Sequence, residues 1–154
     1  MISLRWGSQN LGSFLLSNIN GHLCKLSKLK TMDLDGLIAY TSPKPGVEET
    51  FPFDDKILVW KVMEKMFALS NITEEVLRVN LKCDPDRSIE LREEHSEIIP
   101  GYHMNKTHWN TVIIGEGGLK QSLILSLIDH SYELVVNSLT KAKKEELAEL
   151  QKNI

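Results

Sequence analysis

Three strand-like segments follow one another between residues 57 and 82, and no other feature of the chain restricts its fold as strongly. They comprise residues 57–62, 65–69 and 76–82. The last of them, VLRVNLK, alternates apolar and polar side chains with the two-residue period of a half-buried strand. Turn-like residues at Glu64–Lys65 and Ser70–Thr73 separate the segments, which predicts a β-meander.

Helix signals flank this meander on both sides. Before it, Asp33 or Asp35 can cap a short helix that continues through Tyr40, and residues 43–46 stop it. Residues 47–53 then have the composition of a turn.

After the meander, Asp84 and Pro85 suit the cap and the first position of a helix that runs to about Glu97 and stops at Pro100–Gly101. The remaining expected elements are a strand at 109–114, a helix within 119–139 and a charged helical tail at 141–150. Because the strands are grouped rather than alternating with helices, the pattern favours an α+β fold over a doubly wound sheet.

Length and composition suit one folded domain. The chain has 154 residues, of which 42% are hydrophobic and 25% are charged. No window approaches the roughly 18 uninterrupted apolar residues that a membrane helix needs, so we expect no membrane partner. The two cysteines, Cys24 and Cys83, lie far apart and outside any paired motif. They therefore favour reduced thiols and a cytoplasmic location.

Charge is distributed unevenly between residues 1–31 and the rest of the chain. The first 31 residues contain four basic residues and no acidic one, so 14 basic and 21 acidic residues remain in 32–154, a net charge of −7. This balance argues against non-specific coating of nucleic acid, although a local basic patch remains compatible with it. The Ser- and Asn-rich stretch 1–31 predicts a poorly packed extension, or a start codon placed upstream of a natural start at Met32; a transit peptide has a similar composition. The domain is expected to span 32–154.

The polar segment PGYHMNKTHWNTV, residues 100–112, is the strongest candidate for a binding site. Loops at strand ends concentrate binding residues, and this one offers a cation, amides, imidazoles and an indole face. Such a set could hold a phosphate and a base, or an acidic peptide. The alternative is purely structural: the asparagines fix turns, Trp109 fills the core and the histidines bond to backbone.

Enzymatic and metal-binding motifs are weak or missing in this sequence. His103 and His108 stand five residues apart without an HExxH motif, and a metal site that joins Cys83 to His95 or His103 has no further support. Cys83 also stands beside an acidic residue, and no G-x-S-x-G elbow is present. We therefore expect no enzyme activity, no cofactor and no metal.

Five strings occur in an order and spacing that resemble the MmcQ/YjbR family: KMFAL at 65–69, VNLKCDPD at 79–86, LREEH at 91–95, IPGYHMNKTHWNTV at 99–112 and LIDHSYELVVNSL at 127–139. The resemblance covers about residues 32–150. It implies a frataxin-like, or double-wing, α+β fold: a curved antiparallel sheet with helices packed on one side. Proteins of this family are usually described as DNA-binding on grounds of fold similarity and gene context, and the family has no settled catalytic residues.

The resemblance also selects the positions at which a ligand or DNA would bind. The candidates are Lys82, His103, Asn105, Lys106, His108, Trp109 and Asn110. The first hypothesis is a bacterial, non-enzymatic DNA-binding protein, and the acidic charge of the domain counts against it. The alternatives are a module that binds a protein or a small molecule through the same loop, and a protein that binds cations on its acidic faces.

Overall fold

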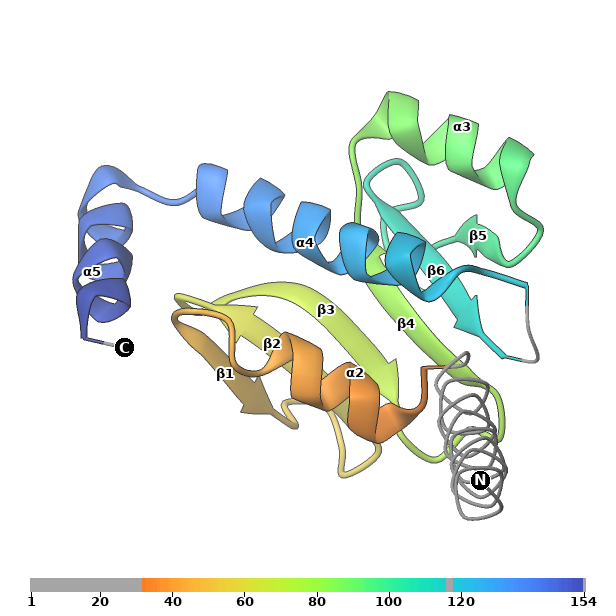
Figure 1. Ribbon diagram of the computed structural model, residues 1–154, viewed down its shortest axis with the longest axis horizontal. Helices are drawn as coiled ribbons and strands as arrows, with labels where there is room; N and C mark the ends of the chain where they lie inside the picture. Colours follow the sequence, from red (N-terminus) through yellow and green to blue (C-terminus); the bar gives the residue numbers. More distant parts are fainter. Residues whose placement is uncertain (1–31, 116–117, 154) are drawn as a thin grey trace, which may run out of the picture. The chain divides into compact units, whose positions relative to one another are not determined.

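The computed structural model describes residues 32–115 and 118–153, which form an α+β domain around one antiparallel sheet (Figure 1). The six strands of this part are ordered β1-β2-β3-β4-β6-β5. The predicted fold class, with a curved antiparallel sheet, is confirmed; the closer likeness to frataxin-like, double-wing proteins stays a prediction. The expected extension, residues 1–31, lies outside the described residues.

The elements follow the chain in the order α2, β1 to β4, α3, β5, β6, α4 and α5. Their bounds are α2 Leu34–Thr41, β1 Val47–Thr50, β2 Ile57–Val62, β3 Lys65–Asn71, β4 Leu77–Lys82, α3 Pro85–Glu94, β5 Ile98–Pro100, β6 Trp109–Ile114, α4 Gln121–Asn137 and α5 Lys141–Lys152. The predicted meander is confirmed as β2, β3 and β4, and the predicted fourth strand as β6. Both predicted helix caps are confirmed too: the Asp33 carboxylate accepts the Gly36 N–H at 2.8 Å, and Asp84 accepts that of Asp86 at 3.1 Å.

Two short edge strands were not expected. The prediction of a turn over 47–53 is wrong for its first four residues, because β1 pairs with β2 from Val47–Val62 to Thr50–Val59. The expected end of α3 at Glu97 is also wrong, since the helix ends at Glu94 and β5 then pairs with β6. The register places Ile98 opposite Val112, and Ile98 is buried. Pairing with β6 and burial of this side chain therefore outweigh continuation of the helix.

The core lies between the sheet and the helices α2 and α4, which pack on the same face (Figure 1). Trp60 and Phe67 are fully buried there, and the Phe67 ring meets Tyr132 of α4 edge-on, with 5.4 Å between ring centroids. The Tyr40 hydroxyl joins α2 to α4 by donating to Asp129 at 2.8 Å. Burial, followed by this hydrogen bond to the carboxylate, raises the pKa of Tyr40. These contacts leave the opposite face of the sheet available for a site.

We expect a histidine at the junction of β4, α3 and α4 to make the domain sensitive to acid. His130 accepts the Asp84 N–H through Nε2 at 3.3 Å, so this nitrogen must be unprotonated. Burial lowers the pKa of His130, Arg87 lowers it further, and the carboxylates of Asp84 and Glu133 oppose the shift. Because the folded pKa lies below the unfolded value, the neutral histidine's contribution is present above about pH 6.5 and is lost as the pH falls through the folded pKa.

We expect His130→Gln to remove this part of the acid sensitivity, since a glutamine oxygen can accept the same N–H without titrating. Urea unfolding of both proteins between pH 8 and pH 5 measures it. The free energy of unfolding of the wild type should fall relative to that of His130→Gln on acidification. A difference between the two that stays constant with pH would contradict the prediction.

Candidate ligand-binding cleft

A row of directly opposed residues crosses all six strands, and four of its members form the floor of a cleft. Thr50 and Val59 begin the row on β1 and β2, and Leu69 continues it on β3. The row then passes through Asn80 and Thr111 and ends at Ile99 on β5. Leu69, Asn80, Thr111 and Ile99 all line the same cavity. Because directly opposed residues share a face, the register brings together side chains from four strands.

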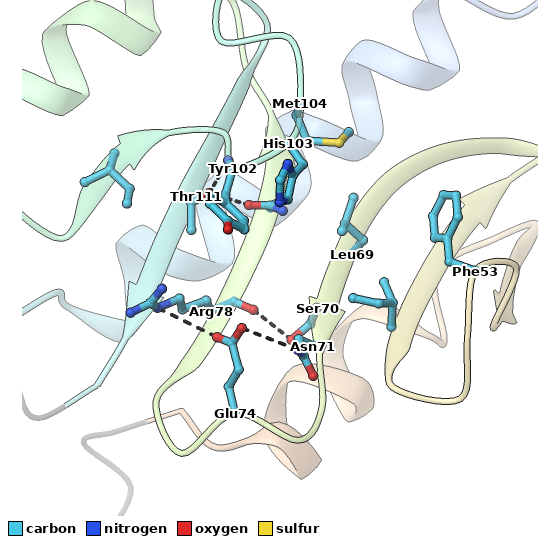
Figure 2. A pocket seen from close by; sticks show the side chains of 13 residues that line it. Phe53, Leu69, Ser70, Asn71, Glu74, Arg78, Tyr102, His103, Met104 and Thr111 are labelled. Carbon is cyan, nitrogen blue, oxygen red and sulfur yellow. Dashed lines mark hydrogen bonds and ion pairs between the residues drawn. The ribbon is translucent and has the colours of Figure 1, made fainter.

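The walls of the cleft come from three loops, and the cavity measures about 610 Å³. Figure 2 shows Phe53 from the β1–β2 loop on one side and Tyr102, His103 and Met104 from the β5–β6 loop on another. Glu74 and Arg78, from the β3–β4 turn and the start of β4, close one end. Phe53 and Tyr102 are 70% and 69% exposed, so two aromatic side chains border this space without being covered by the described residues.

Tyr102 and His103 form one wall of the cleft, called here the aromatic wall, and backbone hydrogen bonds hold it in place. The Tyr102 N–H donates to Thr111 Oγ1 at 3.0 Å, and the Gly101 N–H donates to the Trp109 carbonyl at 2.8 Å. A Cβ on Gly101 would lie 2.9 Å from that same carbonyl, so the close approach requires glycine. The His103 backbone has a positive φ of 55°, and its ring lies against Tyr102 with 4.0 Å between centroids. The rings are therefore exposed on a fixed backbone.

Hydrogen bonds also orient the polar floor. Thr111 Oγ1 donates to Asn80 Oδ1 while it accepts from the Tyr102 backbone. The carbonyl end of the Asn80 amide is thereby occupied, and its Nδ2 is turned away from Thr111. Arg78 Nε lies 3.8 Å from the Glu74 carboxylate, which is too long for a hydrogen bond.

Of the residues predicted for the site, only His103 lines the cleft. The structure places the other six outside it: Lys82, Asn105, Lys106, His108, Trp109 and Asn110. Asn105 fixes a turn, because its Oδ1 accepts the Thr107 N–H at 2.9 Å. Trp109 and Asn110 are buried, at 8% and 2% exposure. Part of the structural alternative therefore describes the geometry: Asn105 fixes a turn and Trp109 is buried, whereas Asn110 lies in β6 and accepts from Arg92 instead of fixing a turn.

Arg92 of α3 holds the predicted segment in place. Its Nε donates to Asn110 Oδ1 at 2.8 Å, and its terminal nitrogen donates to the carbonyls of Lys106 and Trp109. The guanidinium presents its N–H donors in a fixed planar fork, a geometry that a lysine ammonium does not offer. The segment 105–110 is therefore a scaffold for the cleft wall that precedes it.

Sequence reasoning missed most of the lining residues, although one signal for them was present. The alternation in VLRVNLK places Arg78, Asn80 and Lys82 on the face opposite the buried Val79 and Leu81.

Among the described residues no group of three or more His, Cys, Asp or Glu side chains could hold a metal ion. None of the described helices is long and apolar enough to span a bilayer.

Comparison with known proteins decides the family. The YjbR family model matches residues 42–134. This chain belongs to the YjbR family. The uncharacterised protein YjbR of Escherichia coli K12 is 37% identical over 119 residues, which is 77% of this chain and all of the relative. The uncharacterised protein YbdF of Escherichia coli O157:H7 is 41% identical over 97 residues, covering 63% of this chain and 79% of the relative.

Solved structures agree with this YjbR assignment. The crystal structure of Deinococcus radiodurans protein DR2400 superposes with a TM-score of 0.71 and 44% identity, covering 77% of this chain and 89% of that one. A Pseudomonas syringae protein superposes with a TM-score of 0.58 and 30% identity, covering 67% and 98%. The predicted membership of the MmcQ/YjbR family is thus confirmed, and the α+β fold is one that related YjbR chains share.

Proposed function

We propose that this YjbR-family chain is a non-enzymatic binding protein whose ligand occupies the cleft. The observation that carries the proposal is the cavity of about 610 Å³ bordered by exposed Phe53 and Tyr102. Its volume falls within the range of roughly 300–1,000 Å³ typical of small-molecule sites. Aromatic rings exposed to water at the edge of a cavity favour binding, because a ligand that covers them removes apolar surface from water.

A binding role without catalysis is supported by the hydrogen bonds of the serine and threonine hydroxyls that line the cleft. Ser70 Oγ donates to the Arg78 carbonyl at 2.7 Å, and Thr111 Oγ1 donates to Asn80. A nucleophilic hydroxyl would instead give its proton to a base.

The buried, free thiol of Cys83 supports a reducing, cytoplasmic location as part of the same proposal.

The Phe53→Ser variant tests the proposal, and the chain supplies a matched control. Phe53 lines the cleft, whereas Phe51, two residues earlier in the same loop and 48% exposed, does not. We expect soluble aromatic fragments to shift the amide NMR signals of Ile99, Tyr102 and Thr111. Phe53→Ser should weaken their binding by about fivefold, as for the loss of an aromatic contact of about 1 kcal/mol, whereas Phe51→Ser should leave it within about twofold.

If no fragment in the library shifts these signals, or if both variants behave alike, the cleft is not a ligand site. Neither side chain is buried in the core, so neither substitution is expected to disrupt it. Thermal unfolding of the two variants verifies that point.

DNA binding is a second candidate, favoured by the basic side chains on β4. Arg78 and Lys82 stand four residues apart and therefore share the face that carries the cleft. Exposed aromatic rings beside a basic strand suit single-stranded nucleic acid, in which bases stack and phosphates pair with cations. Lys106 adds nothing to the cleft, because it does not line it.

Fluorescence anisotropy with labelled single-stranded and duplex oligonucleotides at low salt separates this candidate from the first. DNA binding requires salt-sensitive association that weakens in Arg78→Glu and Lys82→Glu. An unchanged anisotropy for both oligonucleotides eliminates it.

A further inference from the structure

Two donor groups of the cleft, on Asn80 and Arg78, have no hydrogen-bond partner within it among the described residues. Asn80 Oδ1 is occupied by Thr111, and Asn71 Oδ1 accepts both the N–H and the hydroxyl of Thr73, at 3.0 and 2.8 Å. One oxygen of the Glu74 carboxylate accepts from Asn71 Nδ2 at 3.4 Å, and the other lies 3.8 Å from Arg78 Nε. By contrast, the Asn80 NH₂ group and the guanidinium of Arg78 make no hydrogen bond to another described residue within the cleft.

These two donor groups are placed to act together. Arg78 and Asn80 are two residues apart on β4, so their side chains leave the same face with about 7 Å between their Cα atoms. A carboxylate can accept from both, because it offers two oxygens with several acceptor positions. The long 3.8 Å separation from Glu74 leaves the guanidinium fork available for such a partner.

We propose, on the basis of the binding function above, that the cleft takes a small aromatic carboxylate. Its ring packs among Phe53, Leu69 and Tyr102, and its carboxylate lies between Arg78 and Asn80. Glu74 acts against the ligand, since it offers the same cation a competing carboxylate.

Three isosteric probes test the charge: 2-naphthoate, neutral 2-naphthamide and cationic 2-naphthylmethylamine, each titrated by calorimetry. We expect 2-naphthoate to bind most tightly. Arg78→Gln should weaken it about five- to tenfold, as for a partly exposed charge-assisted hydrogen bond, and Glu74→Gln should strengthen it about twofold. Lys82→Gln is the matched control on the same strand and face, and because Lys82 does not line the cleft its effect should stay within about twofold.

The outcomes separate the two proposals. If 2-naphthamide binds as tightly as 2-naphthoate and Arg78→Gln changes neither affinity, the cleft binds ligands but the carboxylate assignment fails. If 2-naphthylmethylamine binds most tightly and Glu74→Gln weakens it, the cleft selects cations and the assignment is overturned. If none of the three probes binds and no fragment shifts the cleft signals, the proposed function fails together with it.

Discussion

Replacement of Ser131 by alanine is expected to lower the free energy of unfolding by about 2–4 kcal/mol. Ser131 of α4 is fully buried, and its hydroxyl bridges two strands. Its Oγ accepts the Lys82 N–H at 2.8 Å and donates to the Phe67 carbonyl. The β3–β4 ladder pairs Ala68 with Leu81, so the hydroxyl serves the next pair of backbone groups, where the strands have separated. Alanine would leave both groups buried without a partner.

Urea unfolding measures the effect, and Ser126→Ala is its control. Ser126 lies on the same helix and donates to the Leu123 carbonyl at 2.8 Å, but it is exposed. Its replacement should change stability by less than about 0.5 kcal/mol. Equal effects of the two substitutions would show that water or a backbone shift replaces the Ser131 hydroxyl.

The strands of the sheet were easier to predict from the sequence than the register in which they pair. Residues 57–62 and 109–114 were predicted to the residue, because strand propensity and apolar pattern are local properties of the chain. The register of β2 against β3 shifts between Trp60 and Lys61, which brings Phe67 into the core beside Tyr132. No local sequence pattern predicts that shift in register.

Edge strands escaped prediction for a related reason. β1 is VEET and β5 is IIP, segments too short and too irregular to show a two-residue period. Their extended conformation depends on partners that lie elsewhere in the chain. The acids of β1 also suit an exposed edge, where charge discourages pairing with another molecule.

The cleft could be predicted only in part, since its floor depends on that non-local register. Leu69, Asn80, Thr111 and Ile99 are ordinary strand residues until pairing aligns them. Within the polar segment, residues 103–110 were predicted to bind a ligand because their side chains offer many donors, acceptors and an aromatic face. Several of those side chains are used internally, and Arg92, which binds three groups of this segment, stands more than ten residues away in sequence.

Arg92→Met should lower the free energy of unfolding by about 2–4 kcal/mol, because it removes three hydrogen bonds from a charged donor and leaves the buried Asn110 Oδ1 without its partner. The loss should be concentrated in the loop. Hydrogen exchange measures it directly at the amides of His108 and Trp109, which donate to the Asn105 carbonyl at 3.1 and 2.9 Å.

The variant should also affect the cleft, although Arg92 does not line it. Arg92 and the Gly101 N–H donate to the same Trp109 carbonyl, at 3.2 and 2.8 Å, and Tyr102 follows Gly101 directly. Loosening this carbonyl therefore loosens the aromatic wall, and we expect 2-naphthoate to bind about threefold more weakly, equivalent to a loss of about two-thirds of the energy of one aromatic contact. Arg92→Lys is the decisive comparison, since it keeps the charge but not the planar fork. Faster exchange and weaker binding in both variants indicate that the fork positions the wall, whereas wild-type behaviour of Arg92→Lys would assign the effect to charge alone.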